Sequence, residues 1–371
     1  MAHKPRVLIL GGLNVCAPAL LNFLVPDNQE PLVSAVLVAD KYSVHPPTTY
    51  LGSRVKKTLQ NPIVRYRQAN LTNPTTVASY VFDFAGEIRY DRSDEIHLSQ
   101  TTKLVQILGL EAAKRKVRAY GVSSERDPIP PAGVRGYWWH EAARALAAIP
   151  DLNLVVLRCA ATYGPQQIFG TVTSRIVIDI YQALRFNTLH SEDVAAAMFH
   201  AANWMAGIGR PEANRLAGEV FPHFPASDSS VEAQANAVVS IAAKPVAPYF
   251  NVVDDTDTNL TLAGGIIAEV FGIKFSFYGI LASVALKSMV EDINEEHMKP
   301  WTEIILTSNP PVPNTPLTAF VDAHNLAKHS VAYSNEKIKR VLGFTLRHPK
   351  FTADEVRAVI DSFREEGTWP N

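Results

Sequence analysis

The sequence predicts an α/β protein, a doubly wound parallel sheet with a smaller C-terminal α/β subdomain. Short apolar runs that are typical of buried strands alternate with longer segments of helical apolar spacing in the first half of the 371 residues. The expected strands are Val7–Leu10, Val33–Ala39, Tyr80–Phe84, Arg118–Val122 and Leu154–Leu157. Strands that alternate with helices favour parallel pairing, because each crossover helix covers one face of the sheet.

Two long helices are expected in this first half, at Glu95–Arg115 and Tyr137–Ala148. Beyond Pro165 we expect one strand, at Tyr249–Val253, and four helices. The helices are expected at Val172–Leu184, from 189 through Trp204, at Leu262–Phe271 and at Thr352–Arg364. Residues Gly207–Val246 are rich in Ala, Pro, Ser and Glu, and we expect mostly an excursion or mobile loop there.

The chain is long enough for two domains. We expect a nucleotide-binding domain over residues 1–165 and a substrate subdomain over most of residues 166–371. Within the latter, residues 189–204 and 249–254 are expected to return to the core of the first domain.

Composition excludes several classes of partner. Hydrophobic residues make up 47% and charged residues 19%, with a net charge of −1 and a pI of about 6.8. This balance predicts no nucleic-acid partner and no membrane-surface partner. No apolar run reaches membrane-spanning length, no signal segment is apparent, and only two cysteines are present. We therefore expect a cytoplasmic protein.

The most informative motif is R-V-L-I-L-G-G-L-N-V-C-A, which begins at Arg6. A buried strand, a glycine turn and a helix aim the helix N-terminus at a nucleotide pyrophosphate, as in Rossmann-type folds. Gly11 and Gly12 fit the first glycine of the fingerprint, and Ala17 is small enough for its third position. Asn14 replaces the second glycine, but Asn adopts left-handed conformations readily enough for the turn to survive.

Asp40 follows the second expected strand at the distance typical of a βαβ unit. A carboxylate there accepts hydrogen bonds from a ribose diol and repels a 2′-phosphate. The sequence therefore predicts NAD as the cofactor and makes NADP the weaker alternative.

An ordered series of motifs resembles the extended short-chain dehydrogenase/reductase superfamily, in particular its NAD-dependent epimerase/dehydratase family. Within it the chain is most similar to a poorly characterised, largely fungal branch. The series comprises the glycine turn, Q-A-N-L-T-N at Gln68, F-A-G at Phe84, V-S-S at Val122, L-R-C-A-A-T-Y-G-P at Leu157, L-H-S-E-D-V-A at Leu189, F-N-V-V-D-D at Phe250 and L-G-F at Leu342.

The resemblance implies roles for single residues. Gly11, Gly12, Asn14 and Ala17 would hold the pyrophosphate, and Asp40 the adenosine ribose. The remaining cofactor contacts that it implies are Asn70 and Leu71 beside adenine, Ala85 and Gly86 at the end of the fourth strand, and Tyr163 near the nicotinamide.

The resemblance also implies a catalytic set in which a Ser or Thr and a Tyr act together with a Lys four residues after the Tyr. Ser124 and Tyr137 match the first two, but the residue four positions after Tyr137 is Glu141, and no lysine lies between Tyr120 and Leu157. A carboxylate raises the pKa of a neighbouring phenol, whereas the family's lysine lowers it. Tyr137 is either a catalytic residue without its partner or an aromatic side chain packed against Trp138 and Trp139.

Other groups favour structural roles. We expect no metal site, since His190, Glu192 and Asp193 suit the start of a helix. A homodimer through residues 95–115 and 137–148 is expected by resemblance. Only Arg185-Phe186-Asn187 stands where nucleotide-sugar enzymes of the family place a basic, glycine-containing segment, which argues against a nucleotide-sugar substrate.

Two functions remain open. The first is an NAD(P)-dependent oxidoreductase, epimerase-like in fold, that acts on a small carbonyl substrate other than a nucleotide sugar by noncanonical proton transfer through Ser124 and Tyr137. The alternative is a catalytically silent dinucleotide-binding protein with a structural, sensing or partner-binding role.

Overall fold

The computed structural model describes residues 4–14, 16–69, 79–89, 91–125, 133–165, 187–226, 228–277, 290–312, 315–320 and 332–370, with the backbone alone at 122–125 and 293. The chain divides into two compact units. The first comprises Met1–Cys159, Val194–Val252 and Ser334–Thr345, and the second comprises Ala160–Asp193, Val253–Tyr333 and Leu346–Asn371. The expected helix Val172–Leu184 lies outside the described residues.

The first unit contains one eight-stranded sheet of order β3-β2-β1-β4-β5-β6-β10-β9. The strands are β1 (Arg6–Leu10), β2 (Ala35–Asp40), β3 (Val64–Gln68), β4 (Tyr80–Asp83), β5 (Ala119–Glu125), β6 (Leu154–Cys159), β9 (Gly218–Val220) and β10 (Val246–Val252). All pairs are parallel except β9 with β10. This order confirms the predicted Rossmann-type sheet, with a switch point between β1 and β4.

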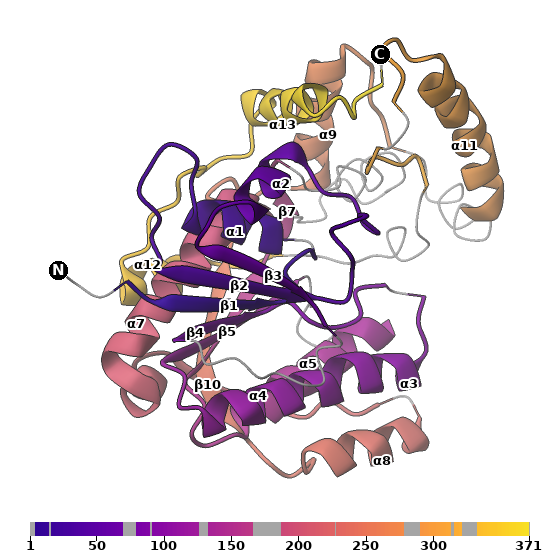
Figure 1. Cartoon of the computed structure of the whole chain (residues 1–371). Coiled ribbons are helices and arrows are strands. Elements are labelled where there is room, and N and C mark those ends of the chain that lie inside the picture. Colours follow the sequence, from indigo (N-terminus) through magenta and orange to yellow (C-terminus); the bar gives the residue numbers. More distant parts are fainter. Residues whose placement is uncertain are drawn as a thin grey trace. The chain divides into compact units, whose positions relative to one another are not determined.

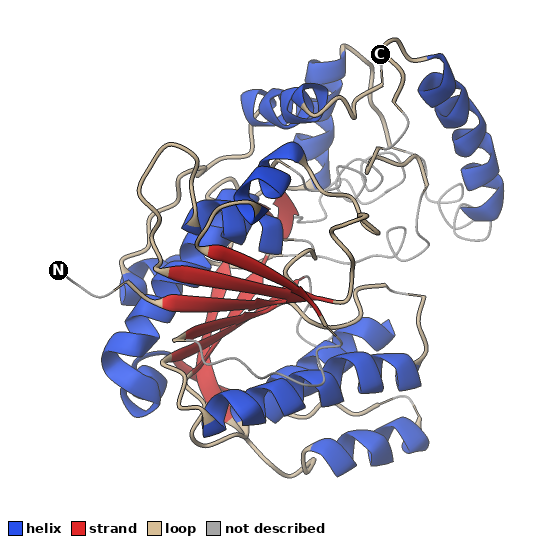
Figure 2. Cartoon of the chain, viewed as in Figure 1, coloured by secondary structure: helices blue, strands red, loops and turns tan. Residues whose placement is uncertain are grey.

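Helices cover both faces of this sheet (Figures 1 and 2). The helices of the first unit are α1 (Ala17–Leu24), α2 (Ser53–Leu59), α3 (Asp94–His97), the π-helical segment η1 (Leu98–Lys103), α4 (Leu104–Lys114), α5 (Gly133–Ala147), most of α7 (Ser191–Ala217), α8 (Ser229–Val238) and α12 (Glu336–Leu342). Figure 1 shows α4 and α5 together on one face, with α8 on their outer side. Leu108, Leu146, Val156 and Tyr120 belong to the buried cluster that joins α4 and α5 to the sheet.

The expectation of a mostly irregular excursion over Gly207–Val246 is wrong. Helix α7 continues to Ala217 across a kink at Gly209, whose φ is 74°, and Pro211 follows near the new helical start, where its missing N–H costs little. Strand β9 then pairs with β10, and Asp228 caps α8 by accepting a hydrogen bond from the Ser230 N–H at 2.6 Å. The Ala-rich composition that resembled a loop is that of good helix formers.

The second unit combines a two-stranded parallel sheet with three described helices. Its elements are β7 (Ala161–Tyr163), β8 (Thr188–His190), α9 (Leu260–Phe271), α11 (Val290–Thr307) and α13 (Ala353–Glu365). Its core joins Tyr163 and Phe351 to the apolar faces of α9 and α13. The assignment of cofactor binding to residues 1–165 and of substrate binding to most of residues 166–371 stays a prediction.

No described helix has the length and apolar character needed to cross a membrane.

Candidate functional site

The glycine turn between β1 and α1 closes tightly on the ends of β2 and β4. Gly11 has φ of 64°, and a Cβ atom built on it would lie 2.6 Å from the Phe84 carbonyl oxygen. A Cβ on Gly12 would lie 2.3 Å from Cγ1 of Val38. Both positions therefore exclude a side chain, one by backbone conformation and both by contact. The fully buried Ala17 opens α1 with the small side chain that was expected.

Asn14 holds the turn in a different way from the one expected. Its side-chain amide donates to the Phe84 carbonyl at 3.3 Å, and its N–H donates to the Gly11 carbonyl at 3.0 Å. Lys116 and Asp257 are the non-glycine residues of positive φ in the described part of the chain, so a left-handed Asn14 is wrong. Gly11 supplies the left-handed residue, which leaves Asn14 to tie the turn to β4.

Helix α1 begins at this turn without a side-chain cap and without an acidic residue in its first turn. The N–H groups at the start of a helix have no intrahelical acceptors, and the helix dipole makes that end attractive to anions. The Ala17 N–H donates to the Asn14 carbonyl at 2.9 Å and Pro18 has no N–H, so the start of α1 attracts a phosphate mainly through the helix dipole.

Asp40 lies at the end of β2, where the sequence placed it, but its carboxylate braces the turn. One oxygen accepts from the Leu13 N–H at 2.8 Å and the other accepts from the Tyr42 N–H at 3.3 Å. The side chain is almost fully covered, and this burial raises the pKa of Asp40, while both backbone hydrogen bonds oppose the rise. The glycine turn therefore fixes the position of the Asp40 carboxylate.

A second buried acid lies at the end of β4 and was not predicted. Asp83 accepts a short hydrogen bond from the Tyr120 hydroxyl and a 2.8 Å hydrogen bond from the Ala85 N–H. Burial raises the pKa of Asp83 to about 7 against the opposing effect of these hydrogen bonds. The signal in the sequence was a charged residue inside an otherwise apolar strand.

Ala85 and Gly86 follow this acid at the carboxyl end of β4. Ala85 is buried, and Gly86 has φ of 141°. A Cβ on Gly86 would lie 2.6 Å from the Trp139 ring, whose Nε1 donates to the Glu87 carbonyl at 3.2 Å. Helix α5 therefore presents Trp139 to the edge of the sheet where cofactors bind in this class of fold.

Tyr137 lies elsewhere on α5. Its ring belongs to a buried cluster with Leu98, Trp138 and Ala235, the last from α8. Its hydroxyl is buried and has no hydrogen-bond partner among the described residues. Burial first and the Glu141 carboxylate second raise the pKa of Tyr137, which is the direction expected from the sequence.

Glu141 is committed to a buried ion pair with Arg144 at 2.6 Å. His223 Nδ1 lies 3.3 Å from the other Glu141 oxygen, and its Nε2 lies 2.7 Å from Glu232 of α8. Arg144 also donates to the Ser240 carbonyl at 3.0 Å. This network anchors the 221–243 segment on α5 and gives Glu141 a structural role.

The expected dimer contact concerns the same helix. Most side chains of α5 are buried within the single chain, which leaves little of residues 137–148 for a partner subunit. Helix α4 keeps Ile107 and Leu110 exposed. The homodimer stays a prediction.

Several predicted positions lie partly or wholly outside the described residues. Asn70 and Leu71 are among them. The backbone of Ser124 lies in β5 in register with Arg158 of β6, as expected for a strand end, and its side chain is outside the description.

Tyr163 belongs to the second unit, where its ring packs edge-on against the rings of His190 and Phe351. The ring centroids lie 5.2 Å and 5.0 Å apart, respectively. His190 stacks on His348 at 3.7 Å with an interplanar angle of 27°. His348 Nδ1 lies 2.8 Å from Glu355. The two histidines and Glu355 lie close enough together to suggest a metal site.

Ring geometry argues against a metal at this cluster. The lone pairs of two stacked imidazoles point along their own ring planes, so one ion between the planes cannot meet both lone pairs in line. His190 Nδ1 already accepts from the Glu192 N–H at 3.2 Å. Glu192 and Asp193 lie in the first turn of α7, as expected, and Asp193 also accepts from the N–H groups of Arg347 and His348.

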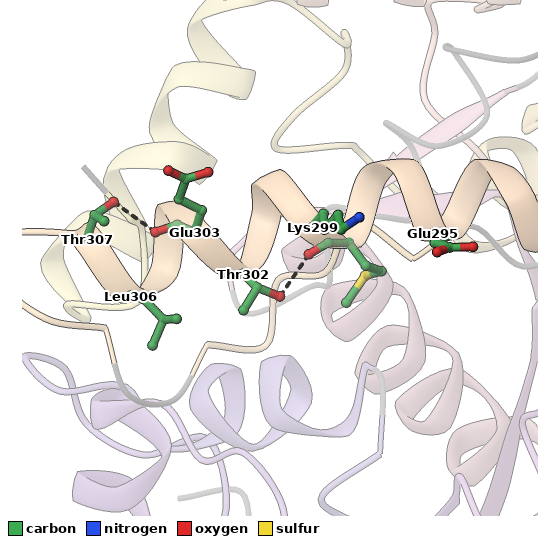
Figure 3. A pocket seen from close by; sticks show the side chains of 7 residues that line it. Glu295, Lys299, Thr302, Glu303, Leu306 and Thr307 are labelled. Carbon is green, nitrogen blue, oxygen red and sulfur yellow. Dashed lines mark hydrogen bonds between the residues drawn. The ribbon is translucent and has the colours of Figure 1, made fainter.

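The second unit also has an open groove along one face of α11 (Figure 3). The hydroxyls of Thr302 and Thr307 both bond carbonyl oxygens of their own helix, at 2.8 Å. The described lining comes from this one helix, so no polar groups from different elements converge there, as they do in most ligand sites.

Comparisons with known proteins agree with this geometry at the level of fold. Neither a protein-family model nor a curated protein sequence matches the chain. Among solved structures, the enzyme WbmG from Bordetella bronchiseptica in complex with NAD and UDP has a TM-score of 0.60 at 13% identity, over 99% of this chain and 96% of WbmG. The chain has the fold of an NAD-bound enzyme.

Two further structures extend the likeness. DesIV, a dTDP-glucose 4,6-dehydratase from Streptomyces venezuelae with NAD bound, has a TM-score of 0.59 at 14% identity, over 98% of each chain. A UDP-galactose 4-epimerase has a TM-score of 0.56 at 14% identity, over 98% of this chain and 100% of the epimerase. The fold implied by the resemblance to the epimerase/dehydratase family is therefore confirmed.

Proposed function

We propose that this chain binds NAD(H) at the β1–α1 turn and is an oxidoreductase for a small carbonyl or alcohol substrate other than a nucleotide sugar. The observation that carries the proposal is the turn itself. A left-handed Gly11 brings the backbone against β4, and α1 starts there without a cap. The NAD-bound structures of the same fold support this choice of ligand.

The residues present fit the dinucleotide. The start of α1 suits the pyrophosphate, with Gly11, Gly12, Asn14 and Ala17 shaping the turn. Asp40 lies at the end of β2, where the resemblance places the acid that holds the adenosine ribose, although its carboxylate is almost fully covered and already accepts two backbone N–H groups. A buried carboxylate favours NAD over NADP. When bound, NAD supplies a hydride acceptor for an alcohol, and NADH supplies a hydride donor for a carbonyl.

Asn187 supports the proposal of a substrate other than a nucleotide sugar. This residue is fully buried, its side-chain amide donates to Asp257 at 3.1 Å, and its side-chain oxygen accepts from the Tyr333 N–H at 2.8 Å. Asn187 is therefore engaged by its own unit, while Arg185, the basic residue of the same segment, lies outside the described residues.

We infer that proton transfer does not follow the usual Tyr–Lys pattern, because Glu141 stands four residues after Tyr137 and is paired with Arg144. Of the two residues that the resemblance implies, Ser124 and Tyr137, we retain Ser124 as the candidate, because the Tyr137 hydroxyl is buried without a hydrogen-bond partner among the described residues. The closed apolar cluster around Tyr137 specifically favours the second function, a dinucleotide-binding protein without turnover.

Titration of the purified protein with NADH and NADPH, followed by cofactor fluorescence, tests the binding proposal. We expect NADH to bind more tightly than NADPH, and Asp40→Ala to narrow the difference by removing the charge that repels the 2′-phosphate. No affinity for either cofactor at millimolar concentration would contradict both functions. Absorbance at the NADH band during incubation with small carbonyl compounds separates them, since only the oxidoreductase consumes NADH.

A further inference from the structure

His97 is the last residue of α3, and its side chain is fully buried in the first unit. Neither ring nitrogen has a hydrogen-bond partner among the residues that the structure describes. The Arg89 backbone lies near enough to raise the pKa of the imidazole, yet it forms no hydrogen bond of ordinary geometry with either nitrogen. Native proteins retain few buried polar groups without partners, and a ligand or a water commonly supplies the missing one.

Other histidines in the described part of the chain differ from His97 in this respect. His140 Nε2 lies 2.7 Å from the Pro222 carbonyl oxygen. His190 accepts from a backbone N–H, and His223 bridges two carboxylates. An unpartnered imidazole is therefore a particular property of His97.

His97 lies one helical turn before a residue that contacts the carboxyl end of β4. Thr101 follows it by four residues, and its hydroxyl accepts from the Glu87 N–H at 3.0 Å. Gly86 lies against both Thr101 and Trp139. The carboxyl end of a central parallel strand beside the switch point is where ligands bind in open α/β sheets. The π-helical segment η1 begins directly after His97, and such segments are frequent at functional sites.

The surroundings of His97 lower its pKa and so favour the neutral imidazole. Burial is the largest effect and lowers its pKa, and Arg135 acts in the same direction. Glu87 and Asp94 oppose them. A neutral imidazole offers one donor and one acceptor, which suits a hydroxyl or a carboxamide.

We propose that His97 is a cofactor-binding residue that hydrogen-bonds the nicotinamide–ribose half of the dinucleotide. The inference rests on the proposed function, and it names a polar partner on α3 for the half of the cofactor that lacks the usual lysine on α5. The hydroxyls of the nicotinamide ribose and the carboxamide are the groups it would meet.

The test measures the affinities of wild type, His97→Leu and His97→Gln for ADP, ADP-ribose and NAD⁺ by isothermal titration calorimetry. We expect His97→Leu to weaken the affinity for NAD⁺ about tenfold, the equivalent of about 1.4 kcal/mol, and to leave the affinity for ADP unchanged. His97→Gln should recover part of the loss, since an amide also donates and accepts. If the affinities for ADP-ribose and NAD⁺ fall equally, the contact is to the nicotinamide ribose. If only the affinity for NAD⁺ falls, the contact is to the nicotinamide.

Thermal unfolding without ligand provides an independent readout. We expect His97→Leu to unfold at the same temperature as wild type or above it, because no hydrogen bond is lost. His140→Leu is the matched control and should unfold at a lower temperature, because it loses the bond to Pro222.

Four outcomes separate the proposals. An equal loss for ADP and NAD⁺, or a His97→Leu variant as destabilised as His140→Leu, overturns the role of His97. Unchanged NAD⁺ affinity in His97→Leu overturns it as well, while wild-type binding of NAD⁺ still supports the proposed function. Absence of NAD⁺ binding to the wild type overturns both.

Discussion

Glu141 and Arg144 form an ion pair across one turn of α5, with neither side chain exposed to solvent. Glu141 is thus part of a structural network. Arg144 and His223 extend this network to the segment that carries α8.

Glu141→Gln is expected to destabilise the protein strongly, because it leaves the Arg144 guanidinium buried without its counter-ion. Breaking a buried ion pair from one side costs about 3–5 kcal/mol. The fall in the urea midpoint measures the effect. Glu212→Gln is the matched control, since Glu212 and Arg215 form an exposed pair of the same spacing, and it should leave the midpoint unchanged. Equal midpoints for the two variants would refute the structural role.

Tyr137→Phe is expected to leave the stability unchanged or raise it by up to about 1 kcal/mol, because the hydroxyl that it removes is buried without a partner. Any NADH-consuming activity should also persist. Thermal unfolding and NADH absorbance measure the two effects. A large loss of activity at unchanged stability would instead place Tyr137 in the reaction.

Asp83 should make stability fall as pH rises. Its pKa is raised to about 7 in the folded protein, above the value of about 4 in an unfolded chain, so the neutral acid is the form that folding favours. The contribution is fully present below pH 4 and is lost as pH rises through 7. Between pH 5 and 8 the urea midpoint of the wild type should therefore fall relative to that of Asp83→Asn. A difference that is independent of pH would contradict the shifted pKa.

His348 predicts a loss of stability at higher pH. Hydrogen bonding to Glu192 is the largest cause that raises its pKa to about 9, with Glu355 acting in the same direction and burial opposing them. The folded pKa lies above that of an unfolded histidine, so the contribution is present below about pH 6.5 and is lost as pH rises through 9. His348→Gln should remove this step from the pH dependence of the urea midpoint. A step that persists in the variant would assign it to another group.

The sequence predicted the fold through its strands, because apolar runs that end in Gly11 and Asp40 leave few alternatives to a βαβ unit. It did not predict α8, since an Ala- and Ser-rich segment reads as a loop until its cap at Asp228 and its packing on α5 are known. His97 was missed for a physical reason. A buried histidine without a partner has no sequence signature, because its state depends on what surrounds it in space.

The affinity of Gly11→Ala for NADH, compared with that of Gly343→Ala, tests the central claim most directly. The two glycines have φ of 64° and 63°, but a Cβ meets the Phe84 carbonyl only at Gly11, whereas nothing lies within 4 Å at Gly343. Each variant carries a left-handed alanine that costs about 1–2 kcal/mol, so the backbone penalty is matched.

We predict that Gly11→Ala weakens NADH binding by about tenfold or more, since its turn can no longer close at the start of α1, and that Gly343→Ala binds as the wild type does. NADH affinity unchanged in Gly11→Ala, or lowered equally in both variants, would contradict the account.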